Sequence, residues 1–314
     1  MRGIAMAGNK PFAAGIGCTN IDLLYTGLSA LPKEGEEVYA KGLSLQLGGG
    51  APATLLLLAK LGVPTVLATQ LGDDLFSRFA RAQFRAFGME PVNLYAGEGA
   101  ALNVSACLVT ARDRSFVSFG PGDPAPTDAA LQAAYEACRG AKLVLMQPGG
   151  FLPVYETLKA EGAALVLDCG WREDLTLASF KPYLELADYY TPNRKEACKL
   201  TGADTPQEAI SVLARYFAHP LVKLDRGGCL GLEAGRLFTV GPVDFGAAVD
   251  ATGAGDAFSA GFLYGLFHGY AFADCLLLGN CTGGKCVSAV GCLGASLSEG
   301  ELLARFQKEQ ARRA

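Results

Sequence analysis

An alternation of short apolar runs with longer helical stretches constrains this fold more than any other feature of the sequence. One of the helical stretches, residues 51–61, ends before Gly62, and glycine is the residue that most favours a helix C-terminus. Buried strands that alternate with helices predict a mostly parallel α/β sheet, covered by helices on both faces. The predicted strands are residues 13–18, 65–69, 143–146, 164–167, 189–190 and 220–224.

Two segments interrupt this rhythm, residues 23–47 and 101–120. They contain alternating apolar and polar stretches bounded by Gly, Pro and charged turns, a pattern typical of antiparallel strands. Because such strands cannot continue a βαβ sheet, we predict that they form a small β lid on the main domain. No linker or repeat divides the chain, so we expect a single domain over residues 11–314, preceded by a flexible extension at residues 1–10.

Composition and charge exclude several classes of protein. Hydrophobic residues make up 50% of the chain and charged residues 18%, a balance that excludes intrinsic disorder. The net charge of −4, without a basic cluster, argues against nucleic acid as a partner. No apolar stretch approaches the roughly 20 residues that span a membrane, and the N-terminus lacks the apolar core of a secretory signal. We therefore expect no membrane partner.

The cysteines indicate a compartment. The chain has 10 Cys without a C-x-x-C pair and only 2 His, so a zinc site is not expected. Most of these cysteines lie among Ala, Leu and Val, where a thiol behaves as a small buried hydrophobe. Free thiols are typical of a reducing compartment, and we therefore expect a cytoplasmic protein.

The strongest chemical signal is the run DATGAGDAFSAGFLYGL, residues 250–266. Its small residues Gly253, Ala254 and Gly255 form a turn that leads directly into a long apolar helix. Such a turn leaves backbone N–H groups pointing into one space at the positive end of the helix dipole, where they stabilise negative charge. Asp256 lies in the first turn of this helix. A carboxylate beside an anion-binding turn can deprotonate an alcohol while a phosphoryl group is transferred to it.

This run resembles the C-terminal signature of the ribokinase-like (PfkB) carbohydrate kinases. The resemblance covers nearly the whole chain, about residues 13–298, with the family's motifs in their usual order. It implies a ribokinase-like fold and a kinase that uses ATP. It also implies that Asp256 is the catalytic base and that the backbone of Gly253, Ala254 and Gly255 is the anion hole.

A second segment of the resemblance is GIGCTNIDLL, residues 15–24. A strand here carries Asn20 and Asp22 on the same side, because side chains alternate along a strand. Paired polar groups of this kind suit the vicinal hydroxyls of a sugar. The resemblance to ribokinase is closest here and implies that Asn20 and Asp22 contact the acceptor.

A glycine run precedes the predicted helix at residues 51–61. Glycines before a helix N-terminus allow the main chain to approach a polar ligand closely, and the resemblance places Gly48 and Gly49 in the acceptor site. The family usually has an Asn at the position of Ala53, or of Thr54 if the register shifts by one residue. This departure leaves the identity of the sugar open.

The run TPNRKEACKLTG, residues 191–202, resembles the family's Asn-x-x-Glu motif at Asn193 and Glu196. A carboxylate near the phosphates can order Mg²⁺ through water, since this ion keeps most of its hydration shell. The resemblance therefore implies that Asn193 and Glu196 organise Mg²⁺ beside the nucleotide.

Further residues are implied by looser matches. The run VKLDRGGCLG, residues 222–231, takes the place of the family's nucleotide segment, with Lys223 and Gly228 as candidate contacts for ATP. Asn280 resembles a position beside the adenine. By analogy with family members that need a monovalent cation, Asp250 and Thr252 are candidate neighbours of K⁺.

The run GNCTGGKC, residues 279–286, imitates a phosphate-binding P-loop with Cys in place of Ser or Thr. No predicted strand precedes this run and the hydroxyl ligand for Mg²⁺ is missing, so we reject it as a nucleotide site.

The sequence favours an ATP-dependent kinase that phosphorylates a hydroxyl of a ribose- or fructose-like sugar. A nucleoside kinase of the same fold is the first alternative, and Phe116, Phe119 or Trp171 could then supply a slot for the base. A non-catalytic protein that binds sugar or nucleotide is the second. Exposed strand edges on the lid favour pairing with another copy, so we expect a homodimer through the lid.

Overall fold

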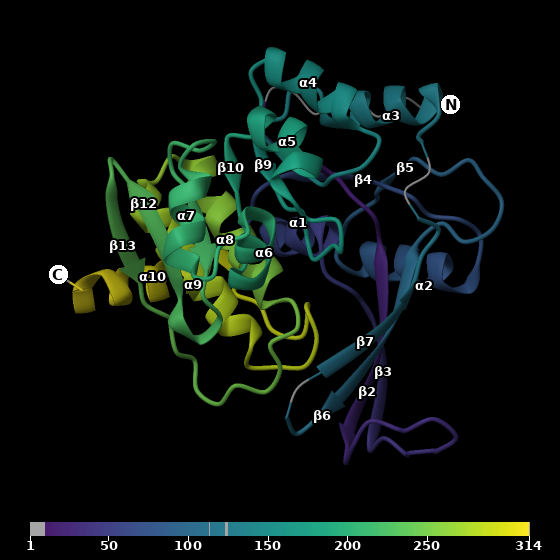
Figure 1. The fold of residues 1–314 in the computed structure, drawn as a ribbon. Coiled ribbons are helices and arrows are strands. Elements are labelled where there is room, and N and C mark those ends of the chain that lie inside the picture. Colours follow the sequence, from purple (N-terminus) through teal and green to yellow (C-terminus); the bar gives the residue numbers. More distant parts are fainter. Residues whose placement is uncertain (1–9, 113, 123–124, 314) are drawn as a thin grey trace.

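The computed structural model describes residues 10–112, 114–122 and 125–313, so most of the predicted N-terminal extension lies outside the described residues. Its centre is a six-stranded parallel sheet in the order β10-β9-β8-β1-β4-β5 (Figure 1). The five predicted strands in this sheet are confirmed, and the short edge strand β5 was not predicted. The strands are β1 (Ala13–Ile16), β4 (Thr65–Thr69), β5 (Val92–Asn93), β8 (Leu143–Met146), β9 (Ala164–Leu167) and β10 (Tyr189–Tyr190).

Alternate residues of these strands enter two different hydrophobic cores. In β8, Leu143 and Leu145 pack into the core with α1 (Ala51–Lys60), α8 (Ala254–His268) and α9 (Phe272–Cys286). Val144 and Met146 pack into the core with α3 (Asp128–Cys138), α4 (Leu152–Ala160) and α5 (Leu177–Leu186). Both faces of the sheet are thus covered by helices, as Figure 1 shows. The predicted α/β class is confirmed.

The helices begin and end where local chemistry stabilises their termini. Gly62, the glycine predicted to cap α1, has a φ of +84°, in the left-handed region that glycine adopts most readily. At the start of α3, the Thr127 hydroxyl accepts a hydrogen bond from the Ala130 N–H. The helices are α1 (Ala51–Lys60), α2 (Leu75–Ala86), α3 (Asp128–Cys138), α4 (Leu152–Ala160), α5 (Leu177–Leu186), α6 (Arg194–Thr201), α7 (Pro206–Leu213), the 3₁₀ helix η1 (Asp225–Gly227), α8 (Ala254–His268), α9 (Phe272–Cys286) and α10 (Glu299–Arg313).

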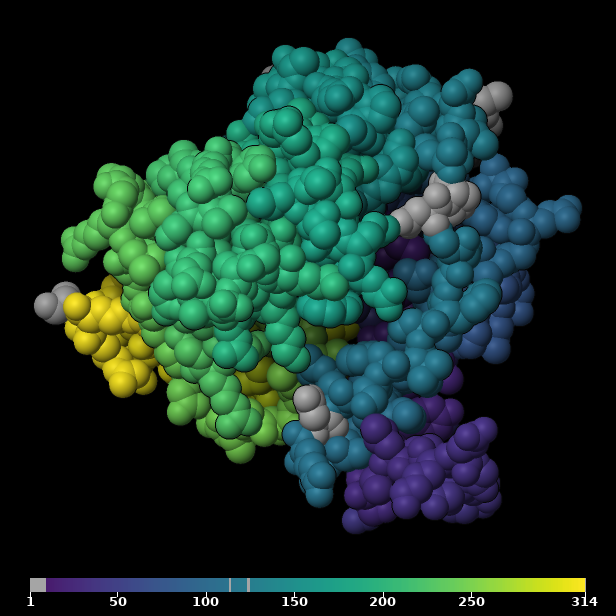
Figure 2. Space-filling model, in the orientation of Figure 1, coloured from purple at the N-terminus to yellow at the C-terminus, as the bar shows by residue number. Residues whose placement is uncertain are grey.

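The predicted β lid is a four-stranded sheet in the order β3-β2-β6-β7. It consists of β2 (Asn20–Leu28), β3 (Gly42–Leu47), β6 (Asn103–Thr110) and β7 (Arg114–Phe119). The prediction of antiparallel strands is wrong for the central pair, because β2 and β6 run parallel. These strands come from segments separated by α1, β4 and α2, and that long crossover allows the parallel pairing. The lid projects from the body of the molecule (Figures 1 and 2).

The prediction that residues 220–224 belong to the parallel sheet is wrong. This segment forms β11 (Leu221–Lys223), which pairs antiparallel with β12 (Cys229–Glu233), followed by β13 (Arg236–Val240). The tight turn at η1 allows the chain to fold back on itself before another helix can form. Only one parallel bridge, between Asn193 and Lys223, links β11 to the segment after β10 among the described residues. The P-loop-like residues 279–286 lie within α9, in agreement with their rejection.

Within the described part of the chain, no helix combines the length and apolar character needed to cross a membrane.

Candidate active site

The predicted chemical residues gather at the carboxyl ends of the parallel strands. A cavity of about 490 Å³ lies there, and the surface is hollowed between the body and the lid (Figure 2). Ligands of open α/β sheets bind at this edge, because it collects the loops and helix N-termini that follow each strand. Of the predicted site residues, those that line the cavity are Asn20, Asn193, Glu196, Lys223, Gly253, Gly255 and Asp256.

The turn before α8 has the form expected of an anion-binding site. Gly253 has a φ of +77°, in the left-handed region, and a Cβ there would lie 2.2 Å from the Cβ of Cys292, so only glycine fits. Ala254, Gly255 and Asp256 form the first turn of α8, where backbone N–H groups have no acceptor within the helix. Gly253, Gly255 and Asp256 line the cavity at the positive end of the helix dipole, whereas the Ala254 N–H donates to the Ala251 oxygen at 3.3 Å.

Asp256 lies between the N-termini of two helices. Its Oδ1 accepts a hydrogen bond of 2.9 Å from the N–H of Gly50, the residue that precedes α1. A Cβ at Gly49 would lie 2.5 Å from Asp256 Oδ2, so this glycine is needed to admit the carboxylate. Burial, followed by the charge of Asp168, raises the pKa of Asp256 to about 7.

Asn193 and Glu196 form a capping box at the start of α6. The Asn193 side chain accepts from the Glu196 N–H at 2.9 Å, and Glu196 Oε2 accepts from the Asn193 N–H at 2.9 Å. Burial raises the pKa of Glu196, the positive charge of Lys223 opposes this, and the charge of Asp168 adds to it. The box fixes the carboxylate at the edge of the cavity.

Lys223 lies at the end of β11, beside the first turn of α8. Its Nζ is 3.5 Å from the backbone oxygen of Gly255. In this part of the cavity it faces the carboxylates of Asp168, Glu196 and Asp256. This excess of negative charge fits a hydrated Mg²⁺ carried on a phosphate group. Among the described residues, no three His, Cys, Asp or Glu side chains form a metal site on their own.

The acceptor residues of the sequence prediction lie on the inner face of the lid. Asn20 Nδ2 donates to the Gly49 oxygen at 2.9 Å, while its Oδ1 accepts from Asn103 Nδ2 at 2.9 Å. A second cavity, of about 440 Å³, is lined by Asn20, Asp22, Gly49 and Gly253 among others, and it adjoins the first.

Asp22 is a buried carboxylate in this second cavity. Its side chain is only 7% exposed, and burial together with the charge of Asp250 raises its pKa to about 6. Gly48 makes room for it, because a Cβ there would lie 2.8 Å from Asp22 Oδ1. The structure thus brings Asn20, Asp22, Gly48 and Gly49 together near Asp256.

Neither residue considered in place of the family Asn lines these cavities. Ala53 and Thr54 are both 0% exposed. The Thr54 hydroxyl donates to the backbone oxygen of Asp256 at 3.4 Å, so it supports the turn from beneath.

Gly228 and Asn280 lie apart from the residues around Asp256. Asn280 Nδ2 donates to the backbone oxygens of Val240 and Gly241 at 2.9 and 3.0 Å, and a Cβ at Gly228 would lie 2.2 Å from the Val240 oxygen. Both residues therefore hold the end of β13 against its neighbours.

Asp250 and Thr252 lie in the loop before Gly253, which is held together by hydrogen bonds to the Asp250 carboxylate. Asp250 Oδ1 accepts from the N–H and hydroxyl of Thr252 at 2.9 and 2.8 Å, and Oδ2 accepts from the Gly291 N–H at 2.8 Å. Arg114 of the lid lies 3.6 Å from Asp250 Oδ1. The expected role of Asp250 and Thr252 beside K⁺ stays a prediction, and we derive no step through this ion.

Sequence reasoning missed several polar residues of the cavities. Gln147 and Asp168 come directly after β8 and β9, and this position at the carboxyl end of a predicted strand could have identified them. Asn103 and Arg114 begin lid strands and carried no such signal.

The aromatic residues considered for a nucleobase are divided between the cavities. Trp171 lines the first cavity, whereas Phe116 and Phe119 line the second. They do not form a single slot.

The fold is a parallel α/β sheet with a β lid, and a carboxylate from the N-terminus of a helix faces the cavity between them. This combination is typical of small-molecule kinases of the ribokinase fold. The chain belongs to the pfkB family of carbohydrate kinases, whose family model matches residues 11–299. The resemblance seen in the sequence is thereby confirmed, and the protein is a carbohydrate kinase of this family.

One curated relative agrees with this assignment, and two solved structures share the fold. A fructokinase of Klebsiella pneumoniae is 30% identical over 287 residues, which cover 81% of this chain and 90% of that protein. The structure of Arabidopsis thaliana ribokinase complexed with ribose and ATP matches with a TM-score of 0.79 and 24% identity, covering 95% of this chain and 99% of that one. A Burkholderia thailandensis nucleoside kinase in complex with inosine matches with a TM-score of 0.76 and 19% identity, covering 95% and 97%.

Proposed function

We propose that the protein transfers the γ-phosphoryl group of ATP to a hydroxyl of a ribose- or fructose-like sugar. Asp256 takes the hydroxyl proton, the acceptor oxygen bonds to the γ-phosphorus, the bond from that phosphorus to the bridging oxygen breaks, and ADP leaves. One observation carries the proposal: a half-buried carboxylate faces the cavity beside the first turn of α8, with a pKa raised to about 7 by burial. A general base works best when its pKa is close to the working pH.

The first turn of α8 supplies the electrostatic part of the reaction. The backbone N–H groups of Gly253, Ala254 and Gly255 stabilise negative charge on the transferring group, and Lys223 adds a full positive charge beside Gly255. Asn193 and Glu196 hold Mg²⁺ through water, and this ion, when bound, neutralises phosphate charge. We assign Gly228 and Asn280 to the outer part of the nucleotide site, as the resemblance implies.

The acceptor lies between the lid and Asp256 in this proposal. Asp22 and Asn20 contact its hydroxyls, and the backbone at Gly48 and Gly49 closes the site from one side. Two observations support a sugar: the residues nearest to Asp256 are polar, and the aromatic residues do not form a slot for a base.

A nucleoside kinase is the second candidate. Phe116 is 48% exposed and lines the same cavity as Asp22, so its ring is available to a base attached to the acceptor sugar. The inosine complex of the Burkholderia relative makes this a substantive alternative. The intact Asp256 and its helix turn argue against a protein that only binds sugar or nucleotide.

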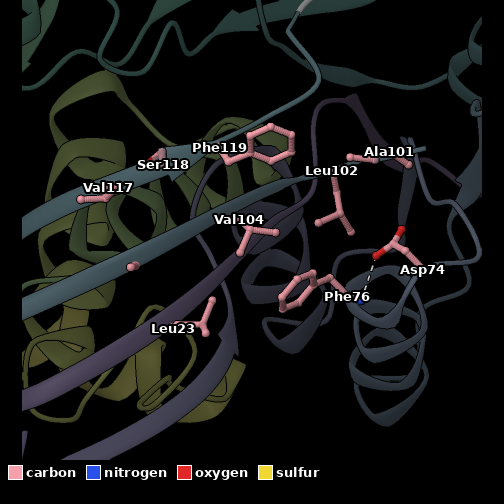
Figure 3. Close-up of a pocket in the computed structure, with 11 residues that line it drawn as sticks. Leu23, Asp74, Phe76, Ala101, Leu102, Val104, Val117, Ser118 and Phe119 are labelled. Carbon is pink, nitrogen blue, oxygen red and sulfur yellow. Dashed lines mark hydrogen bonds between the residues drawn. The ribbon is translucent and has the colours of Figure 1, made fainter.

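We also propose that two copies pair through the outer face of the lid. Figure 3 shows Phe76 of α2, Leu102 just before β6 and Val104 of β6 around an apolar cavity. The volume of this cavity is about 480 Å³. Val117 and Phe119 also line this cavity and are 68% and 64% exposed, and Phe119 borders the second cavity as well. An apolar face of this kind is typical of interaction surfaces. Light scattering is expected to show a dimer, and Val117→Glu a monomer.

Two broader expectations belong to the same proposal. We infer that residues 11–314 act as one domain, because the lid strands and the core of the sheet alternate along the chain and share the cavities. None of the ten cysteines, all of which lie in the described part of the chain, forms a disulfide, and this supports our expectation of a reducing, cytoplasmic location.

A coupled assay of ADP release tests the proposed function. Purified protein is incubated with ATP, Mg²⁺ and one acceptor from a panel containing D-ribose, D-fructose, 2-deoxyribose, inosine and cytidine. Turnover with a free sugar at least ten times that with the nucleosides is expected, and mass spectrometry should show a single added phosphate. Preference for a nucleoside would favour the second candidate, and ATP binding without turnover on any acceptor would overturn the proposal.

A further inference from the structure

Two basic side chains approach the N-terminal end of α8, and they come from different parts of the molecule. Lys223 extends from β11 in the body toward Gly255. Arg114 extends from the first residue of β7 in the lid, and its Nη1 lies 3.3 Å from the Thr252 hydroxyl and 3.6 Å from Asp250 Oδ1. The lid is thus tied by a charged contact to the loop that forms the anion hole.

Asp250 is the centre of that loop. Its two oxygens hold the N–H and hydroxyl of Thr252 and the N–H of Gly291, and its side chain is only 10% exposed. Thr252 in turn is followed directly by Gly253. A change in the position of Asp250 or Thr252 therefore also changes the position of the backbone amides that face the transferring phosphoryl group in our proposal.

Arg114 also borders the cavity proposed for the acceptor. It lines both cavities, together with Asn20, Asn103 and Gly253. Its guanidinium lies 6.0 Å from the centre of the Phe116 ring, on the strand that faces Asp22 across β6. An acceptor that orders these lid strands orders Arg114 as well.

We propose that Arg114 is a positioning residue that couples acceptor binding to the shape of the anion hole. This inference rests on the proposed kinase function. When an acceptor holds the lid strands, Arg114 holds Asp250 and Thr252, and the amides after Thr252 are fixed in the geometry that receives a phosphate. Because coupling between two ligands is reciprocal, acceptor and nucleotide then bind more tightly together than separately.

Calorimetry with a non-hydrolysable ATP analogue and Mg²⁺ tests the coupling directly. The Kd of the analogue is measured alone and with a saturating concentration of the acceptor that the panel identifies. We expect the acceptor to tighten analogue binding about 5- to 20-fold in the natural protein, within the usual range for coupled sites. In Arg114→Gln this ratio is expected to fall to about 1, while the Kd of the analogue alone changes less than about 2-fold.

Two further variants separate a positioning role from a structural one. Arg112→Gln alters an exposed arginine close to Arg114 in the chain and should keep the full ratio. Arg114→Lys keeps the charge beside Asp250 with fewer donors, and it should restore an intermediate ratio. Equal melting temperatures of the variants confirm that each is folded.

The outcomes distinguish this inference from the proposed function. An unchanged ratio in Arg114→Gln, or no synergy in a natural protein that turns over acceptor, would overturn the coupling alone. Absence of turnover on the whole panel would instead overturn the kinase proposal.

Discussion

On the body side of the site, Asp256, Glu196 and Lys223 are fixed at the ends of helices α8 and α6 and strand β11. On the lid side, Asn20, Asp22 and Arg114 extend from strands β2 and β7. The body side collects carboxylates whose pKa values are raised by burial, and it faces the phosphate groups in our proposal. The lid side presents polar side chains to the acceptor.

This contrast separates two tasks of one site. Groups at helix ends are held by backbone geometry, so they suit charge stabilisation, which depends on fixed donors. Groups on lid strands belong to a sheet separate from that of the body, and a lid of this kind suits recognition of an acceptor that enters and leaves. Variants of the body side should therefore lower kcat, and variants of the lid side should raise the KM of the acceptor.

The largest effect is expected for Asp256→Asn. The amide cannot take a proton, and kcat should fall about 10²- to 10⁴-fold, the usual contribution of a general base. The Kd of the ATP analogue should change little, as measured by calorimetry. Asp128→Asn, an exposed acidic residue in the first turn of α3, is the matched control and should be unaffected. Activity near that of the natural protein would show that Asp256 is not the general base. The distinction between a catalytic body side and an acceptor-binding lid side would then not hold.

The next largest effect is expected for Lys223→Met. Loss of the charge beside Gly255 should lower kcat about 10²-fold, the order found when one oxyanion donor is removed, with little change in acceptor KM. Since Lys223 lowers the pKa of both Asp256 and Glu196, its loss should also shift the acidic limb of the pH–rate profile upward. Lys195→Met, at an exposed position in α6, is the control. A larger change in acceptor KM than in kcat would show that Lys223 binds the acceptor, the task that we assign to the lid side.

The body side could be predicted from the sequence to a greater extent than the lid side. Capping residues, a Gly-x-Gly turn and an acidic first turn are local patterns, and local patterns mark helix ends in a single sequence. Asp256 was found in this way, in the first turn of the helix after Gly255. Asn193 and Glu196 were implied by the family motif, and the structure shows that they also form a capping box.

The lid side depends on pairings that no local pattern contains. The parallel pairing of β2 with β6 places Asn103 beside Asn20, although 83 positions separate the two residues. The contact of Arg114 with Asp250 spans an even longer separation. The prediction that residues 220–224 join the parallel sheet was wrong for the same reason. The strand β11 pairs with β12, which follows it in the chain, and no pattern within residues 220–224 shows that partner.

A moderate effect is expected for Asp22→Asn on the lid side. The amide presents a weaker acceptor to a sugar hydroxyl, and acceptor KM should rise about 10-fold, the order of one hydrogen bond to a charged group. The change in kcat should be smaller. In the natural protein, acceptor KM should also rise below about pH 6, where Asp22 becomes protonated, and Asp22→Asn should lose that dependence. Steady-state kinetics over a pH series measures both effects, and an unchanged KM would place the acceptor elsewhere.

The smallest effect concerns stability, and it tests whether the body side is strained by its charges. The pKa of Asp256 is raised from 3.8 to about 7, so the folded state binds this proton more tightly than the unfolded state does. The favourable contribution is therefore complete below about pH 4 and is lost as the pH rises to about 7. Above that pH the ionised carboxylate destabilises the fold.

Asp256→Asn should therefore be more stable than the natural protein at pH 8, because the amide carries no charge and still accepts from Gly50. The pKa shift corresponds to roughly 4 kcal/mol, and we expect about 1–2 kcal/mol of it because solvent in the open cavity screens the half-buried carboxylate. The gain should grow from pH 4 to pH 7 and then level off. Asp22→Asn should show the same sign with a smaller gain that levels off near pH 6, since the pKa of Asp22 is raised only to about 6. Melting temperatures over a pH series measure both curves. A larger gain for Asp22→Asn would mean that the lid, and not the body, carries the greater electrostatic strain.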